Sequence, residues 1–239
     1  MEQTIVNVSS EGITGTGLSQ ISENFNKCVR GYHLVNVSSI NETVWEDINA
    51  LVFTSVGIEV FSKSDGSHSP GMDIQSSIGG LSNKSAKYSK NNKSFDISSY
   101  RLTTVCDGKN CGTPADIIEE INSRKNFTYY SFMVRDELSV EGSITYDWIL
   151  IPSDHPLLNP AVYTWEPTVG KRGKGKDVQV GWNTNVVNGC SMKISFSMSS
   201  QLWIHIEMTE ELTKYVIASS TVSNKPKFNY IQLYDNDKL

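Results

Sequence analysis

The chain has 239 residues, of which 38% are hydrophobic and 20% are charged, and its formal net charge is −5. This length and composition exclude a disordered chain and are sufficient for one domain with a substantial core. No segment has the apolar length of a transmembrane helix, and residues 1–4 do not begin a secretory signal, so we expect a cytoplasmic protein without membrane contact.

The first predicted elements are a helix and three strands. Asn41 is a suitable N-cap for a helix over residues 42–55, where apolar residues recur at helical spacing. The lysine-rich segment 84–93 is expected to be a loop. Three strands are predicted around it, at residues 58–62, from Asp73 onward and at residues 94–105.

A second helix and further strands follow. Thr113 and Pro114 supply an N-cap and a first helical residue for a helix to about residue 125. A strand is expected at residues 127–134. Alternating apolar residues then predict additional β structure within residues 143–215, with strands at 143–151, 192–196 and 202–206.

The remaining features complete the expected fold. The large aromatic side chains of the second half are Trp148, Trp165, Trp182 and Trp203. They are expected to fill the core between layers, and base stacking is the alternative. Residues 219–239 are polar and predict a tail or a short strand around residues 230–234. We therefore predict one α/β (α+β) domain over residues 1–239, a mixed sheet flanked by helices with additional C-terminal β structure.

Two carboxylates in this order of elements suggest a function. Asp73 follows Pro70-Gly71-Met72, where a turn enters a strand, and Asp96 lies on the strand predicted at residues 94–105. Acids on adjacent strands can share a divalent metal ion that neutralises a phosphodiester and activates water. The simpler alternative is that Asp73 caps a turn and that Asp96 is an exposed strand residue, since Asp is common at both places.

The order of elements and the positions of these acids resemble the core of the PD-(D/E)xK nucleases, in particular the type II restriction endonucleases, over about residues 42–135. In that family an acid at the start of the second strand and an acid-x-Lys on the third bind Mg²⁺ and position the attacking water. The resemblance implies that Asp73 and Asp96 bind Mg²⁺. The Ile97 carbonyl is a further candidate ligand, and Glu59 or Glu46 is a candidate support.

This chain departs from the family pattern at the motif lysine. Ser98 stands where the acid-x-Lys motif has its lysine. Lysines of the segment before Asp96 are therefore candidates for the missing cation, with Lys84 and Lys87 as the catalytic candidates. Lys90 and Lys93, from the same segment, are expected to contact DNA phosphates.

A second basic cluster predicts further DNA contacts. Lys171, Arg172, Lys174 and Lys176 would suit phosphates, although a solvated loop is the simpler alternative. Gln179 and Asn183 follow, and such side chains can read adenine in the major groove. The negative net charge does not exclude a local basic groove of this kind.

The function expected from the sequence is that of a type II restriction endonuclease, which hydrolyses double-stranded DNA at a short sequence with Mg²⁺. A homodimer is expected, because two symmetric sites cut two antiparallel strands most simply. One alternative is a non-catalytic β-rich binding or structural protein. Another is a repair nuclease on the same core that recognises DNA structure. Only the nuclease hypotheses require the two carboxylates to lie within reach of one ion.

Overall fold

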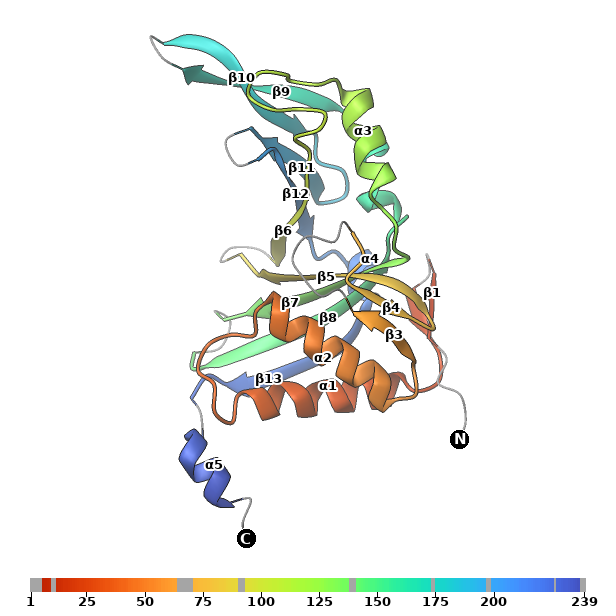
Figure 1. Cartoon of the computed structure of the whole chain (residues 1–239), viewed down its shortest axis with the longest axis vertical. Coiled ribbons are helices and arrows are strands. Elements are labelled where there is room, and N and C mark those ends of the chain that lie inside the picture. The colour runs from red at the N-terminus through yellow and green to blue at the C-terminus, as the bar shows by residue number, and fades with distance from the viewer. Residues whose placement is uncertain are drawn as a thin grey trace.

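The computed structural model describes residues 6–9, 12–63, 71–89, 93–137, 141–172, 175–196, 199–225 and 227–236. Two helices cover one face of a six-stranded mixed sheet, and a five-stranded antiparallel sheet packs against its other face (Figure 1). A short hairpin near the N-terminus pairs β1 (Asn7–Ser9) with β2 (Gly12–Thr14). The predicted class, a mixed sheet flanked by helices with additional β structure, is confirmed.

The six-stranded sheet has the order β13-β8-β7-β5-β4-β3. Only β5 and β7 are parallel, and the other neighbours are antiparallel. A parallel pair requires a long crossover, and here it contains a strand of the other sheet and a helix. The strands are β3 (Val60–Lys63), β4 (Ile74–Ser76), β5 (Gly79–Lys87), β7 (Tyr129–Asp136), β8 (Ser143–Pro152) and β13 (Val216–Ser223).

Two helices, α1 (Leu18–Tyr32) and α2 (Glu42–Ser55), bury their apolar faces against this sheet. The predicted cap of α2 is confirmed, because Asn41 Oδ1 accepts a hydrogen bond from the Val44 N–H at 3.0 Å. Trp45 of α2 packs edge-on against Trp148 of β8, with ring centroids 4.9 Å apart. This aromatic contact fixes α2 over the centre of the sheet, which matters because the first turn of α2 contributes to the site described below.

The third strand of the sheet differs from the prediction. Residues 79–87 form β5 between β4 and β7, whereas residues 94–101 form a strand of the other sheet. The sequence of β5 is polar, so it lacks the apolar alternation by which strands are recognised. Its Asn83 side chain is nevertheless fully buried, because its Oδ1 accepts a hydrogen bond from Asn49 of α2 at 2.7 Å.

The five-stranded sheet has the order β6-β12-β11-β10-β9, and all its pairs are antiparallel. Helix α3 (Pro114–Ser123) packs beside it, and the predicted helix start is confirmed by a capping box between Thr113 and Asp116. The strands are β6 (Ser94–Arg101), β9 (Trp165–Arg172), β10 (Lys176–Thr184), β11 (Cys190–Ser195) and β12 (Gln201–Glu207).

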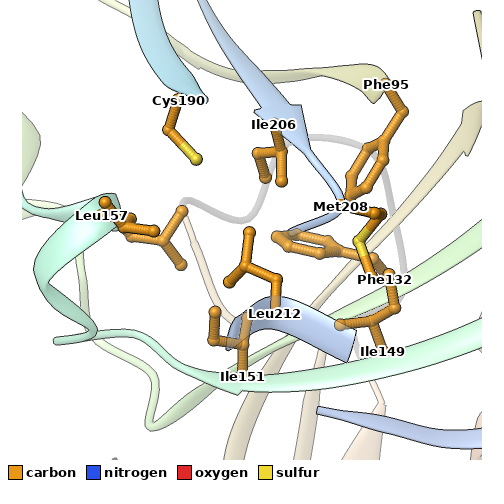
Figure 2. Close-up of a pocket in the computed structure, with 10 residues that line it drawn as sticks. Phe95, Phe132, Ile149, Ile151, Leu157, Cys190, Ile206, Met208 and Leu212 are labelled. Carbon is orange, nitrogen blue, oxygen red and sulfur yellow. The ribbon is translucent and has the colours of Figure 1, made fainter. Parts of the chain in front are cut away.

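The two sheets share one apolar core. Figure 2 shows a small apolar pocket in it, where Phe95 and Ile206 of the five-stranded sheet approach Phe132 and Ile149 of the six-stranded sheet. The rings of Phe95 and Phe132 meet edge-on, with centroids 5.9 Å apart. The short helix α4 (Glu210–Thr213) and the 3-10 turns η1 (Pro156–Leu158) and η2 (Pro160–Val162) close this core at its side.

Two predictions about the second half are wrong. Trp148, Trp165 and Trp182 are buried as expected, but Trp203 is 41% exposed on the outer face of β12. Residues 216–223 form β13 beside β8, and α5 (Tyr230–Asn236) is a helix instead of a tail or a strand. The described helices include none that is long and apolar enough to cross a membrane.

Candidate functional site

The turn before β4 places Asp73 at the start of that strand. Gly71 has a φ of 90°, and a Cβ built there would lie 2.4 Å from Asn126 Oδ1 and 2.6 Å from the Arg124 carbonyl oxygen. Only glycine fits, because both the backbone angle and the space exclude a side chain. The turn therefore packs tightly against the segment between α3 and β7, and this contact fixes the position of Asp73.

Asp73 is held by the neighbouring strand β5. Its Oδ2 accepts a hydrogen bond from the Asn83 N–H at 2.6 Å and a longer one from the Ser82 hydroxyl at 3.4 Å. Its own N–H donates to the Leu81 carbonyl at 2.8 Å. The side chain is 14% exposed. The carboxylate thus has a defined orientation and limited contact with water.

Lys84 of β5 joins Asp73 to helix α2. Its Nζ lies 3.6 Å from Asp73 Oδ2, 3.0 Å from Glu42 Oε1 and 2.7 Å from the Asn83 carbonyl oxygen. The Lys84 side chain is 17% exposed. Among the candidate lysines that the structure describes, Lys84 is the one beside Asp73.

The charges of this cluster do not balance. Burial raises the pKa of Asp73 despite the nearby Lys84 ammonium and the Asn83 N–H. Burial raises the pKa of Glu46 as well, and the charges of Asp73 and Glu42 raise it further. Burial lowers the pKa of Lys84, but Asp73 and Glu42 more than offset this, so its pKa is raised and it stays charged. Lys63 also lowers the pKa of Glu46, but it forms an ion pair with Asp47. Carboxylates therefore outnumber ammonium groups here, and the excess of negative charge favours a cation.

The donor set of this cluster fits Mg²⁺ by its chemistry. Asp73, Glu42 and Glu46 offer carboxylate oxygens, which are the hard ligands that this ion prefers. Within the described residues, no three Asp, Glu, His or Cys side chains already converge as a finished metal site. The site is therefore an acidic cluster around Lys84, which ligand or substrate binding would have to complete.

Asp96 does not belong to this cluster. It lies on β6, which pairs with β12, whereas β4 pairs with β3 and β5. Its carboxylate is 63% exposed, and its Oδ1 accepts a hydrogen bond from His205 Nδ1 at 2.8 Å. The prediction that Asp73 and Asp96 lie on neighbouring strands is wrong, because β5 occupies the place that residues 94–105 were expected to take.

The residues predicted around Asp96 lie apart from Asp73 as well. Ser98 lies on the outer face of β6, opposite Trp203 in the register. The Ile97 side chain is buried in the core between the sheets, and Ile97 pairs with Ile204 of β12. These positions give Ser98 and Ile97 no place in the acidic cluster around Lys84.

The other lysines of the first basic cluster have different positions. Lys87 forms an ion pair with Glu137, and this carboxylate also accepts a hydrogen bond from Arg135 Nε at 2.9 Å. Lys93 is exposed just before β6. Lys90 lies outside the described residues. Lys87 is therefore engaged by another carboxylate and not by Asp73.

The second basic cluster lies at the end of a β-ribbon. β10 pairs with β11 only at residues 181–183, so residues 176–179 pair with β9 alone and project from the sheet, at the upper left of Figure 1. Exposed Lys171 forms an ion pair with Asp177 at 2.5 Å, and Lys176 is exposed beside it. Arg172 ends β9, and Lys174 lies outside the described residues.

The two amides predicted to read bases differ in their freedom. Gln179 Nε2 donates a hydrogen bond to the Gly181 carbonyl at 3.0 Å, so this amide already has a partner in its own strand. Asn183 is exposed on the outer face of the five-stranded sheet. Asn183 is thus the more accessible of the two.

Glu42 and the Ser82-Asn83 pair were not singled out from the sequence, although a signal for Ser82 was present. Two residues separate Ser76 from Gly79 and Gly80, which is the length of a tight hairpin turn. In the register of such a hairpin, Asp73 lies opposite Ser82. Lys84 then follows two residues later on the same strand. Glu42 had no such signal, because its position depends on how α2 packs on the sheet.

The comparisons with known proteins identify no relative. No protein-family model matches the chain, and no curated protein or solved structure is significantly similar to it.

Proposed function

We propose that the protein is a Mg²⁺-dependent endonuclease that hydrolyses phosphodiester bonds in double-stranded DNA. The observation that carries the proposal is the position of Lys84 Nζ, 3.6 Å from Asp73 on the adjacent strand, with Glu42 3.0 Å away on its other side. Helix α2 and strands β3, β4 and β5 follow one another in the order of the nuclease core named above. Lys84 then takes the place of the motif lysine.

This assignment changes which motif residue is substituted. Ser82 stands two residues before Lys84, where the family has its second acid. Glu46 lies four residues after Glu42, one turn further along α2, and is the candidate for the second carboxylate in its place. Asp73 and Glu46 would hold Mg²⁺, with Glu42 in support. The lysine that appeared to be missing is present, and the acid of the motif comes from the helix.

The chemistry of the site follows from these positions. Bound Mg²⁺ would neutralise charge on the scissile phosphate and lower the pKa of a water molecule. Lys84 is oriented by the Asn83 carbonyl and by Glu42, and its ammonium can donate a hydrogen bond to the attacking water or to a phosphate oxygen. A fixed positive charge at that place stabilises the negative charge that develops in the transition state.

The β-ribbon supports the choice of duplex DNA as the substrate. A two-stranded ribbon fits the major groove of B-DNA. In this proposal Lys171 and Lys176 at its end contact phosphates, as do Arg172 and Lys174 of the same segment of the sequence. Asn183 and Gln179 are the candidates for base contacts. The full proposal is a cytoplasmic type II restriction endonuclease that acts as a homodimer, since symmetric sites would cut both strands.

Plasmid digestion tests the proposal. Wild type is expected to convert supercoiled DNA into discrete fragments with Mg²⁺ and to leave it intact with a chelator. Asp73→Asn and Lys84→Gln are expected to lower the cleavage rate by about 100-fold or more, because each removes a group that acts on the transition state. Glu119→Gln and Lys109→Gln, at exposed positions of α3 and of the loop before it, are the matched controls.

The other outcomes are equally informative. If folded wild type cuts neither duplex nor branched DNA with several divalent ions, the nuclease proposal is wrong and a non-catalytic binding protein is favoured. Cleavage that gives no discrete fragments but concentrates at branches or lesions supports the repair nuclease. Full activity of Asp73→Asn would show that the site is elsewhere.

A further inference from the structure

The outer face of the five-stranded sheet has an open groove that the proposed catalytic cluster does not use. Its volume is about 570 Å³, within the range of roughly 300–1,000 Å³ that is typical of ligand clefts. Its lining comes from four neighbouring strands and includes Asp96, Asn183, Ser191, Lys193, Trp203 and His205. Apart from Met192, the lining side chains are polar or aromatic, in contrast to the apolar pocket of Figure 2.

The register of the strands sets an aromatic ring beside a positive charge. On β12 the side chains alternate, so Leu202, Ile204 and Ile206 enter the core while Trp203 and His205 face outward. Trp203 lies opposite Ser98 of β6 and opposite Lys193 of β11, and Lys193 lies opposite Asn183 of β10. Adjacent strands are about 4.8 Å apart, so these side chains form a continuous row.

Trp203 and Lys193 are available to a ligand. The Trp203 side chain is 41% exposed, whereas the four other tryptophans are buried. Its cross-strand neighbour Ser98 is small and leaves part of the indole uncovered. Lys193 is exposed, and no described carboxylate forms an ion pair with it.

The Asp96–His205 pair holds the one carboxylate of the groove lining in place. His205 Nδ1 donates to Asp96 Oδ1 at 2.8 Å, which fixes the ring and leaves its Nε2 directed away from the carboxylate. The Asp96 carboxylate thus has a hydrogen-bond partner, whereas no described carboxylate pairs with Lys193, the other charged side chain of the lining. A ligand with a planar ring and a negative group complements this surface.

We propose that this groove binds one unpaired nucleotide of a DNA strand, with the base stacked on Trp203 and its phosphate at Lys193. An aromatic platform beside a lysine is how proteins hold single strands, since every base has a π-face. Inside a duplex both faces of a base are covered by its neighbours, so the bound nucleotide must be single-stranded or extruded. Asn183 can donate to the edge of the base. The choice of DNA as the strand rests on the proposed nuclease function.

Fluorescence anisotropy tests this inference with a short labelled oligothymidylate, at low salt and with a chelator so that no cleavage occurs. Trp203→Ala is expected to bind about tenfold more weakly, and Trp203→Phe is expected to retain most of the affinity. Lys193→Gln is expected to bind more weakly and to lower the salt-dependence slope by about 0.7. Lys109→Gln, at an exposed loop position, is the matched control. Circular dichroism verifies that each variant is folded.

Three results would overturn the inference. The first is equal affinity of wild type and folded Trp203→Ala for the oligothymidylate. The second is competition by free thymidine monophosphate at the concentration of the strand, which would make a small nucleotide the ligand. The third is a change of oligomeric state in Trp203→Ala without loss of DNA binding, which would make this face a subunit interface.

The same variants separate this inference from the catalytic proposal. If both are correct, Asp73→Asn loses cleavage and keeps its affinity for the oligothymidylate. If Asp73→Asn cuts like wild type while Trp203→Ala loses affinity, the catalytic assignment fails and the groove stands. If Asp73→Asn loses cleavage and Trp203→Ala binds normally, only the groove fails.

Discussion

Asp73 and Asp96 have similar surroundings in the sequence and opposite surroundings in the structure. Asp73 is largely buried among carboxylates with one lysine, and its pKa is raised by burial. Asp96 is exposed and has a histidine as its partner. The comparison shows that an acid at a strand start has no fixed role. The sheet to which the strand belongs decides whether the carboxylate meets other charges or water.

The largest difference is expected between an aromatic residue of the core that the two sheets share and one on the outer face of the five-stranded sheet. Phe132→Ala opens the shared core and should lower the free energy of unfolding by about 3–5 kcal/mol. Trp203→Ala, on the outer face, should change it by about 0.5 kcal/mol or less. Urea denaturation measures both. A loss of several kcal/mol in Trp203→Ala would show that the outer face is part of the packing and not a free surface.

The two acids should differ next in their effect on metal binding. Mg²⁺ at about 100 times its dissociation constant should stabilise wild type by about 2.7 kcal/mol, because it binds the folded state. Asp73→Asn should lose this stabilisation and Asp96→Asn should keep it. Thermal unfolding with and without Mg²⁺ measures the shift. The opposite result would restore Asp96 as the metal ligand.

The turn that holds Asp73 should be sensitive to a single methyl group. Gly71→Ala should lower stability by about 1–3 kcal/mol, since alanine disfavours a φ of 90° and its Cβ would contact Asn126 and Arg124. Cleavage should fall as well because Asp73 would shift. Gly142→Ala is the control, since it also has a positive φ but lies in open space. Equal losses in the two variants would mean that only the backbone angle matters.

Glu137 offers a smaller test, through the stability of the protein at low pH. Burial would raise the pKa of Glu137, but hydrogen bonds from Lys87, Ser39 and Arg135 outweigh it and lower the pKa to about 2. The folded state therefore favours the charged form. This contribution to stability is present above the unfolded pKa of 4.5 and is lost as the pH falls toward 2. Glu137→Gln should flatten the pH dependence of unfolding in that window, and an unchanged curve would contradict the assignment.

The sequence predicted those elements that carry their own local signals. α2 and α3 begin at Asn41 and Thr113 as expected, because a cap is a local interaction between neighbouring residues. β5 was missed because its polar residues are buried through hydrogen bonds with α2, and such partners are distant in sequence. The place of Trp203 was missed for the same reason, since which face of β12 is covered depends on the packing of two sheets.

The candidate site was predicted in part. Asp73 and Lys84 were both singled out, and the structure places them side by side. Their link to Glu42 depends on the position of α2 over the sheet, which no local pattern contains. Asp96 was assigned to the same site only because residues 94–105 have the stronger strand pattern than residues 79–87.

The route of the chain through the two sheets has a consequence for folding kinetics. β6 lies within the crossover between β5 and β7, yet it pairs with β12, and Asp96 meets His205 109 residues further along the chain. In the sequence, β6 lies between two strands of the six-stranded sheet, and β7 and β8 lie between two strands of the five-stranded sheet. Neither sheet can therefore be completed while the other is unfolded. Pairings of such sequence separation close large loops, so we expect slow folding in a single cooperative step. No single cut would divide the chain into two halves that fold alone.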